Sequence, residues 1–254
     1  LPLTSVFAKE LLPINGKPGL EYIIEECIEA GIKEIVFIIS KKKLMIKKYF
    51  YNDKFYKDII KKKNDPKIIK EYKKILKYKK MIKFVFQDKP LGTGDAVYKT
   101  KKFITDKYFL MLLPDDLIIK KNCSKSMIAV HNKFKASVMA SMKVNKNDVS
   151  RWGIYNIRKK IDKNNFIINN VVEKPSIKTS PSNNAVIGRY ILPKTIFSKL
   201  KSLKPGKSGE FHITDAIQAL IEDDNQFIGH NFSGKYLDCG TMKGYIKSTL
   251  EISK

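Results

Sequence analysis

The sequence has 254 residues, of which 43% are hydrophobic, and its formal net charge at pH 7 is +25. No apolar stretch approaches the ~20 residues needed to cross a bilayer, and no secretory pattern of charged start, apolar run and cleavage site occurs. We therefore expect no membrane partner. The three cysteines show no paired spacing, which favours a reducing, cytoplasmic compartment.

The large positive charge is compatible with nucleic-acid binding. Only three of the 50 basic residues are arginine, however, and arginine is favoured for bidentate contacts with phosphates and base edges. Abundant lysine together with isoleucine and asparagine is typical of proteins from AT-rich genomes. We expect a solvated lysine-rich surface that steers anionic nucleotides towards a site, and no nucleic-acid partner.

Segments with helical periodicity alternate with short apolar runs along the chain. In residues 17–31, Leu20, Ile24 and Cys27 recur at helical spacing, and the apolar run 34–40 that follows predicts a buried strand. A helix closely followed by such a strand is typical of a sheet covered on both faces. We expect further strands at 81–87, 107–116, 136–144 and 185–192, an antiparallel strand pair within 153–174, and helices at 194–201, 213–223 and 241–253.

No linker rich in proline, glycine or serine divides the chain, so we expect a single domain over residues 1–254. Residues 41–80 differ from the rest because they are dense in Lys, Tyr and Asp and have helical periodicity. We interpret this segment as a helical insertion over one edge of the sheet. An ordinary pair of surface helices and a mobile cover over the active site both fit the pattern.

Two aspartates directly follow an apolar strand. Asp115 and Asp116 end the segment LMLLPDD, and ligands of open α/β sheets bind at the carboxyl ends of strands. Carboxylates at such a position are a common handle for Mg²⁺, although aspartate there can also cap a helix. Asp238 lies between a short apolar stretch and a glycine. It can supply a second carboxylate from a distant part of the chain, or simply occupy a turn.

Residues 86–97 form a strand that ends in a glycine-containing loop and leads into a helix. Gly92 and Gly94 permit a close approach of the backbone to a base or a phosphate. The amide of Gln87 can pair with the imide edge of a pyrimidine. The loop matches neither a Walker A motif nor a dinucleotide-binding motif, so it does not identify a ligand by itself.

Glu173 and Lys174 stand side by side before Pro175. Neighbouring side chains of a regular strand point to opposite faces, so both reach one ligand only if the chain bends there. A carboxylate can accept hydrogen bonds from sugar hydroxyls and a lysine can neutralise a sugar phosphate, while an exposed ion pair is the alternative. Lys9, before an apolar pair and a turn, is on its own only a lysine in a loop.

Taken together, ten stretches in this order resemble the bacterial UTP–glucose-1-phosphate uridylyltransferases. Each stretch is modest, but ten in register over essentially the whole chain are highly specific. The resemblance implies an α/β fold of the nucleotide-diphospho-sugar transferase type, with a Rossmann-like mixed, mostly parallel sheet and helices on both faces. The stretches are LP-T (1–4), AKELLPINGKP (8–18), EAGIKEIVFI (29–38), QDKPLGTGDAV (87–97), LLPDD (112–116), SRWG (150–153), VEKPS (172–176), NNAVIGRYIL (183–192), GEFHITDAI (209–217) and DCGTMKGY (238–245).

The resemblance implies transfer of a uridylyl group from UTP to glucose 1-phosphate, giving UDP-glucose and pyrophosphate in carbohydrate metabolism. It implies Mg²⁺ as the cofactor, and a homo-oligomer is compatible with it. The implied site residues are Asp115 and Asp238 for the metal; Gln87, Pro90, Leu91, Gly92 and Asp116 for the nucleotide; Gly153, Glu173, Lys174 and Gly188 for the sugar; and, in catalysis, Lys9 on the triphosphate, Lys174 on the sugar phosphate and Asp115.

The chain departs from the family pattern in three ways. Asp95 stands where the family usually has histidine, and His212 where it usually has glutamine. The family's opening strand and G-x-G-T-R loop do not occur, so we expect a fragment that lacks its first strand and has weak or no activity. In a complete version, we expect Asp238→Asn or Lys174→Ala to lower turnover by ~10²–10³.

Two alternatives stay open. A thymidylyl- or cytidylyltransferase acting on a sugar 1-phosphate has the same motifs, although the insertion at 41–80 is shorter in the related thymidylyltransferases, which favours UTP. A non-catalytic binding module of the same fold is the second alternative. The retained pair Asp115 and Asp238 weighs against it, because a degenerate relative loses its metal ligands early.

Overall fold

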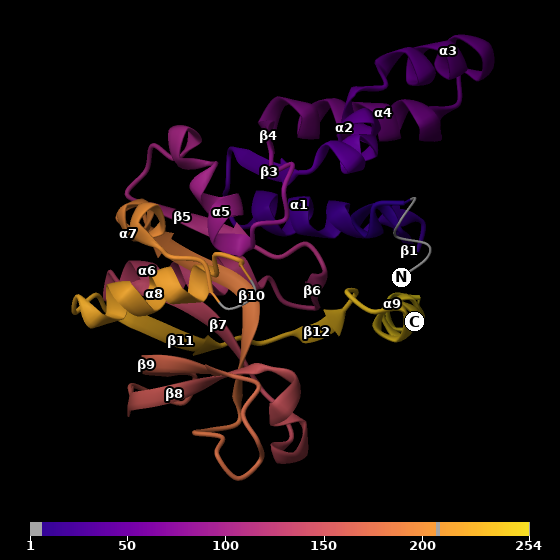
Figure 1. The fold of residues 1–254 in the computed structure, drawn as a ribbon. Helices are drawn as coiled ribbons and strands as arrows, with labels where there is room; N and C mark the ends of the chain where they lie inside the picture. Colours follow the sequence, from indigo (N-terminus) through magenta and orange to yellow (C-terminus); the bar gives the residue numbers. More distant parts are fainter. Residues whose placement is uncertain (1–6, 207–208, 254) are drawn as a thin grey trace.

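The computed structural model describes residues 7–206 and 209–253, so the LP-T stretch at residues 1–4 lies outside the described residues. A six-stranded sheet in the order β5-β10-β7-β11-β9-β8 forms the centre of the fold (Figure 1). The expected antiparallel pair within 153–174 is present as β8 and β9, and β8 also pairs with β10. The strands of this sheet are β5 (Tyr108–Leu112), β7 (Ser137–Lys143), β8 (Gly153–Lys160), β9 (Asn165–Glu173), β10 (Asn184–Pro193) and β11 (Phe227–Asn231).

Successive residues of β7 belong to two different apolar cores. Val138 and Ala140 pack with α6 on one face, whereas Met139 packs with α5, α7 and α8 on the other. Because successive strand side chains point to opposite faces, both faces of the sheet need a helix layer. The expected α/β class is confirmed. The covering helices are α5 (Thr93–Tyr98), α6 (Cys123–Phe134), α7 (Ile196–Ser202) and α8 (Ile213–Glu222).

The sheet is mixed, but fewer of its pairings are parallel than expected. In the described part of the chain, β7–β11 and β3–β4 are parallel, whereas β10 is antiparallel to β5, β7 and β8. The expectation of a mostly parallel sheet does not hold for these pairings, because β10 runs against its neighbours at the centre of the sheet. The separate parallel pair consists of β3 (Ile35–Ile39) and β4 (Ile82–Phe86).

The strand expected at 107–116 is shorter than expected, and a second strand begins at the last residue of the expected segment. β5 ends at Leu112, and Pro114 has no backbone N–H with which to continue a ladder. The chain turns and forms β6 (Asp116–Ile119), which pairs antiparallel with β12 (Lys235–Asp238). The register sets Asp238 opposite Asp116, so two distant acidic segments lie side by side before the last helix, α9 (Met242–Ile252).

Residues 41–80 are helical and project from the body of the molecule (Figure 1). Phe50 of α2 and Ile75 of α4 are buried in one cluster with Ile24 of α1, whereas α3 forms the outer end of the projection. No helix among the described residues is long and apolar enough to cross a membrane. The helices are α1 (Gly19–Glu29), α2 (Leu44–Tyr51), α3 (Asp53–Lys63) and α4 (Pro66–Met81), and a short hairpin of β1 (Pro13–Ile14) and β2 (Lys17–Pro18) precedes them.

A hollow of about 1400 Å³ separates the β3–β4 pair from the central sheet. Side chains of α1, β3 and β5 line it, and among the described residues β3 is paired with β4 alone and β5 with β10 alone.

Candidate active site

Two carboxylates from distant parts of the chain meet beside the β6–β12 pair. A Cβ on Gly240 would lie 2.9 Å from Oδ2 of Asp115 and 3.2 Å from Oδ1 of Asp238. Backbone groups hold both residues, since the Cys239 N–H donates to the Asp115 carbonyl and the Gly240 N–H to Oδ1 of Asp238, each at 2.8 Å. Both carboxylates therefore border one small space, which the missing side chain of Gly240 leaves open.

Lys9 brings a positive charge to the same space. It lies in the 3₁₀ helix Lys9–Leu11, and its Nζ donates to Oδ2 of Asp115 at 2.5 Å. Burial lowers the pKa of Lys9, but the hydrogen bond and the charge of Asp115 outweigh burial and raise that pKa above the usual 10.5. Lys9 is therefore a cation at neutral pH, suited to neutralising a phosphate group.

Asp116 is bound on both oxygens by other protein groups. The Tyr236 hydroxyl donates to its Oδ1 at 2.7 Å, and the Gly188 N–H donates to its Oδ2 at 2.8 Å. Burial raises the pKa of the Asp116 carboxyl. A Cβ on Gly188 would lie only 2.5 Å from Asp116 Oδ2, so glycine is needed there. This arrangement favours a supporting role for both residues, and Tyr236 is a partner that the sequence did not indicate.

The side-chain amide of Gln87 has a fixed orientation. Its Nε2 donates to the Gly92 carbonyl at 3.0 Å and to Oδ2 of Asp95 at 2.8 Å. A carbonyl and a carboxylate are both acceptors, so the amide nitrogen must face them. Gln87 therefore offers a ligand its Oε1, which is an acceptor. Asp95, one of the departures from the family pattern, enforces this orientation.

The loop after β4 is held by the segment before α8. The Phe211 N–H donates to the Leu91 carbonyl at 2.8 Å, and a Cβ on Gly92 would lie 2.5 Å from the Phe211 carbonyl oxygen. Gly92 also has a φ of +92°, a backbone conformation that favours glycine. Gln87 and Pro90 both line the 1400 Å³ hollow. The structure thus places Gln87 and Pro90 at this hollow and joins Gly92 to Gln87 by a hydrogen bond, whereas Leu91 and Gly92 do not line the hollow.

Glu173 and Lys174 form a third group at the end of β9. Lys174 has a φ of +44°, so the chain bends there as a shared ligand requires. The two side chains form an ion pair at 3.8 Å and are 71% and 65% exposed. A Cβ on Gly153 would lie 3.1 Å from Oε2 of Glu173. Among the described residues, Lys174 makes no ion pair with Asp115 or Asp238. No ion pair therefore joins Lys174 directly to these two carboxylates.

Tyr190 of β10 lies within electrostatic reach of both acidic groups. Burial raises the pKa of the Tyr190 hydroxyl, and the charges of Asp116 and Glu173 raise that pKa further. The ring of Tyr190 belongs to the apolar core between the sheet and α8. Strand pairing places both groups at the same region of the sheet, because Asp116 accepts from the Gly188 N–H of β10, and β10 pairs with β8, whose Gly153 lies opposite Glu173.

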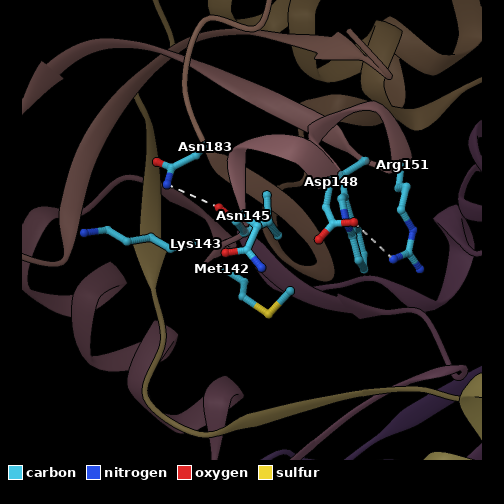
Figure 2. A pocket seen from close by; sticks show the side chains of 8 residues that line it. Met142, Lys143, Asn145, Asp148, Arg151 and Asn183 are labelled. Atoms are coloured by element: carbon cyan, nitrogen blue, oxygen red, sulfur yellow. Dashed lines mark hydrogen bonds and ion pairs between the residues drawn. The ribbon is translucent and has the colours of Figure 1, made fainter. Parts of the chain in front are cut away.

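A smaller hollow of about 490 Å³ lies where β7 ends and β10 begins (Figure 2). It is bordered by the ion pair of Asp148 with Arg151 at 3.6 Å and by Asn183, whose Nδ2 donates to the Val144 carbonyl at 3.3 Å. None of the expected site residues lines it. It is separate from the site around Asp115.

Asp115 and Asp238 fit one divalent cation. In the described part of the chain, no group of three or more His, Cys, Asp or Glu side chains could hold a metal alone. Mg²⁺ does not need such a group, because it prefers one or two carboxylates and takes its other ligands from water and substrate phosphates. The space beside Gly240, open to both carboxylates, has the donor set that Mg²⁺ prefers.

The protein has an α/β fold in which Asp115, Asp238 and Lys9 lie together next to strand ends. Two carboxylates and a lysine in this position are suited to binding a metal ion and phosphate groups. All residues 1–254 match the family model described as "Nucleotidyl transferase", and the chain belongs to this family. The resemblance noted in the sequence is thereby confirmed at the level of the family.

Similar proteins agree with this assignment. The UTP–glucose-1-phosphate uridylyltransferase 2 of Staphylococcus saprophyticus is 34% identical over 252 residues, which are 99% of this chain and 86% of the relative. A UDP-glucose pyrophosphorylase solved with UDP-glucose has a TM-score of 0.86 at 32% identity and covers 100% of this chain and 93% of its own. A UTP-bound UGPase from Acinetobacter baumannii has a TM-score of 0.90 at 28% identity, with coverage of 99% and 88%.

Proposed function

We propose that this chain transfers the uridylyl group of UTP to glucose 1-phosphate, giving UDP-glucose and pyrophosphate. The similarity of the whole chain to relatives named for this activity supports the proposal. The structural observation that carries it is the meeting of Lys9, Asp115 and Asp238 around one small space. A site that handles several phosphate groups needs a cation and ligands for a metal at the same place.

The reaction joins two anions. An oxygen of the glucose 1-phosphate attacks the α-phosphorus of UTP, the bond from that phosphorus to the bridging oxygen of the β-phosphate breaks, and pyrophosphate leaves with the electron pair. Alignment and charge neutralisation are therefore the main tasks of the protein. In the proposal, Lys9 offsets charge on the departing pyrophosphate, Lys174 neutralises the sugar phosphate, and Glu173 accepts hydrogen bonds from sugar hydroxyls.

Mg²⁺ is the proposed cofactor, held by Asp115 and Asp238. When bound, it supplies charge neutralisation to the phosphate oxygens. Asp115 and Asp238 would orient it through the carboxylate oxygens that border Gly240. Asp116 contributes indirectly, because its two oxygens hold Tyr236 and the Gly188 backbone in place.

The orientation of Gln87 supports a base with an imide N–H. The N3 of uracil or thymine carries a hydrogen that Oε1 of Gln87 can accept, whereas N3 of cytosine is itself an acceptor. This geometry favours UTP or dTTP over CTP. The helices of residues 41–80, a segment that is shorter in the related thymidylyltransferases, favour UTP over dTTP.

A cytoplasmic setting is part of the proposal. Cys27 and Cys123 are free and buried, and burial raises the pKa of each thiol to about 12. Free thiols of this kind are typical of reducing compartments.

The experiment is a panel of nucleotides. The purified chain receives glucose 1-phosphate, Mg²⁺ and one of UTP, dTTP, CTP or ATP, and pyrophosphate release and the nucleotide sugar are measured together. At whatever rate the chain turns over, we expect UDP-glucose as the main product and its loss on addition of EDTA. A main product from CTP or ATP, or unchanged turnover in EDTA, contradicts the proposal. Calorimetric binding of the four nucleotides gives the same ranking if turnover is slow.

A further inference from the structure

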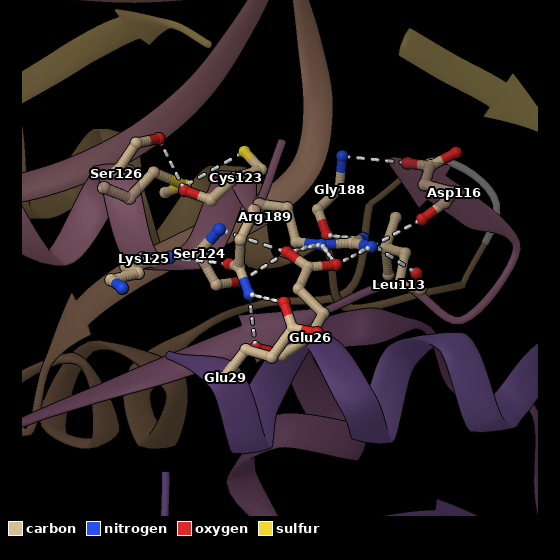
Figure 3. Close-up of polar contacts among 12 residues, drawn as sticks. Glu26, Glu29, Leu113, Asp116, Cys123, Ser124, Lys125, Ser126, Gly188 and Arg189 are labelled. Carbon is tan, nitrogen blue, oxygen red and sulfur yellow. Dashed lines mark hydrogen bonds and ion pairs between the residues drawn. The ribbon is translucent and has the colours of Figure 1, made fainter. Parts of the chain in front are cut away.

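One arginine is fully buried at the centre of β10. Arg189 has 0% exposure, and Figure 3 shows its guanidinium between α1 and the turn 113–116. It forms an ion pair with Glu26 of α1, in which Nη2 lies 2.9 Å from Oε2 and Nε lies 3.2 Å from each carboxylate oxygen. A charged side chain at such a place in an apolar strand needs a specific partner.

The other donors of Arg189 hold the turn that carries Asp115. Nη1 donates to the Leu113 carbonyl at 3.1 Å, and Nη2 donates to the Asp116 carbonyl at 2.6 Å. These two carbonyls flank Asp115 on both sides. Nη1 also donates to the Gly188 carbonyl at 3.1 Å, so every N–H of the guanidinium has a partner. One rigid planar group therefore holds both ends of the turn.

Glu26 fixes Arg189 in return. Its Oε1 accepts hydrogen bonds from the Ser124 N–H at 3.1 Å and from the Ser124 hydroxyl at 2.5 Å, at the start of α6. A buried ion pair adds little net stability compared with apolar side chains of similar volume. The particular effect of the arginine in this pair is the fixed direction of its hydrogen bonds, since a lysine supplies the charge but lacks the planar fork of donors.

We propose that Arg189, oriented by Glu26, is a positioning residue that fixes the turn 113–116 so that the Asp115 carboxylate faces Asp238. Its link to turnover rests on the proposed function. Pro114 interrupts the backbone ladder between β5 and β6. Backbone bonds such as that from the Cys239 N–H to the Asp115 carbonyl also hold the turn, but Arg189 is the side chain that contacts both of its ends. A shift of about 1 Å in a reacting group can lower a rate about 100-fold.

Two variants separate positioning from stability. Arg189→Lys keeps the charge next to Glu26 but cannot reach both carbonyls of the turn. The double variant Glu26→Leu with Arg189→Met replaces the ion pair by apolar side chains and removes every hydrogen bond from residue 189 to the carbonyls of the turn. Arg158→Lys, an exposed arginine of β8, is the matched control.

We expect Arg189→Lys to unfold at a urea concentration near that of the wild type, and the double variant at a lower one because Glu26→Leu leaves the buried Ser124 donors without this acceptor. In both variants we expect kcat to fall about 100-fold and KM for glucose 1-phosphate to stay unchanged. The control keeps the wild-type kcat. Wild-type turnover in both variants overturns the proposal. Failure of both variants to fold also overturns it, because the pair then serves stability.

A measurement without turnover distinguishes this inference from the proposed function. In the presence of UTP, we expect Arg189→Lys to bind Mn²⁺ more weakly than the wild type does, while it binds UTP alone normally. Electron paramagnetic resonance measures the free Mn²⁺. Equal Mn²⁺ affinity in variant and wild type contradicts the positioning role. If the wild type makes no UDP-glucose, the proposed function fails, and the Mn²⁺ comparison alone decides the role of Arg189.

Discussion

Among single residues, Gly240 is important because it has no side chain to fill the space between Asp115 and Asp238. A methyl group there would lie 2.9 Å from Oδ2 of Asp115 and 3.2 Å from Oδ1 of Asp238, and the backbone of Gly240 lies outside the left-handed region. We expect Gly240→Ala to fold normally and to lower kcat about 100-fold, since the methyl group displaces a cation from between the carboxylates. Turnover measured against Mg²⁺ concentration checks this expectation.

Gly19→Ala is the control for that variant. Its added Cβ would lie 3.4 Å from Cδ1 of Ile14, an ordinary contact. If Gly240→Ala and Gly19→Ala show the same Mg²⁺ dependence, the space beside Gly240 does not hold the metal.

Asp95 and the Gly92 carbonyl together set which face of the Gln87 amide a base meets. Asparagine at position 95 can donate as well as accept, so Asp95→Asn weakens the preference for this orientation, while the Gly92 carbonyl still favours it. We expect the ratio of kcat/KM for UTP over CTP to fall about tenfold, the equivalent of one hydrogen bond. Asp58→Asn on the exposed side of α3 is the control. An unchanged ratio in Asp95→Asn would show that Asp95 does not orient Gln87.

At the level of elements, α1 anchors the projecting helices through a buried carboxylate. Glu21 has 0% exposure and accepts hydrogen bonds from the Tyr49 hydroxyl of α2 and, at 2.6 Å, from Nζ of Lys74 of α4. Glu21→Ala leaves the Tyr49 hydroxyl without this acceptor and leaves Lys74 with its ion pair to Glu71 at 3.0 Å. We expect the free energy of unfolding in urea to fall by about 1–3 kcal/mol.

Glu29→Ala tests the same helix without the anchor, because Glu29 is exposed. Its effect on the unfolding free energy should be much smaller. Equal stability of Glu21→Ala and Glu29→Ala would mean that the apolar contacts of Phe50 and Ile75 alone hold the projection. The sequence left a surface helix pair and a mobile cover open for this segment. The buried anchor at Glu21 favours a packed element.

Strand β11 shows where sequence patterns fail for an element. Its residues Phe227–Asn231 include Gly229 and His230, so they form neither an apolar run nor a regular alternation. The strand is nevertheless buried between β7 and β9. Gly229 leaves room there for the ring of Phe166, and His230 finds two polar partners, neither of which is near in the sequence.

For the whole molecule, His230 couples stability to pH. One ring nitrogen lies 2.8 Å from Oδ1 of Asn165 and the other 3.2 Å from the Ser126 hydroxyl. Burial lowers the pKa of His230 below its usual 6.5, although the charge of Asp162 opposes this shift. The unfolded chain therefore binds the proton more readily, and this contribution to stability is present above pH 6.5 and is lost as the pH falls.

We expect the urea midpoint of the wild type to fall more between pH 7.5 and pH 5.5 than that of His230→Gln, which cannot titrate at this position. The comparison uses the change with pH, because losing the imidazole also changes stability at every pH. Parallel pH profiles for the two proteins would assign the pH dependence to other groups.

The sequence by itself determined the class of the protein and most of its elements. Apolar periodicity located the helix at 17–31 and the strands at 34–40 and 81–87, because burial of one face leaves a local pattern of period 3.6 or 2. The ordered motifs determined the family, since each motif is local and their order survives in the chain. The residue patterns indicated Asp115 and Asp238 as separate carboxylates, and the family resemblance predicted that they share one metal ion.

Only the tertiary structure decided how these residues combine. The turn at Pro114 and the β6–β12 pairing set Asp115 and Asp238 at one space, Asp95 oriented Gln87, and Arg189 found Glu26 on another helix. The physical reason is that a contact between distant segments depends on strand pairing and on the directions of buried donors. Neither leaves a periodic signal in the residues that take part.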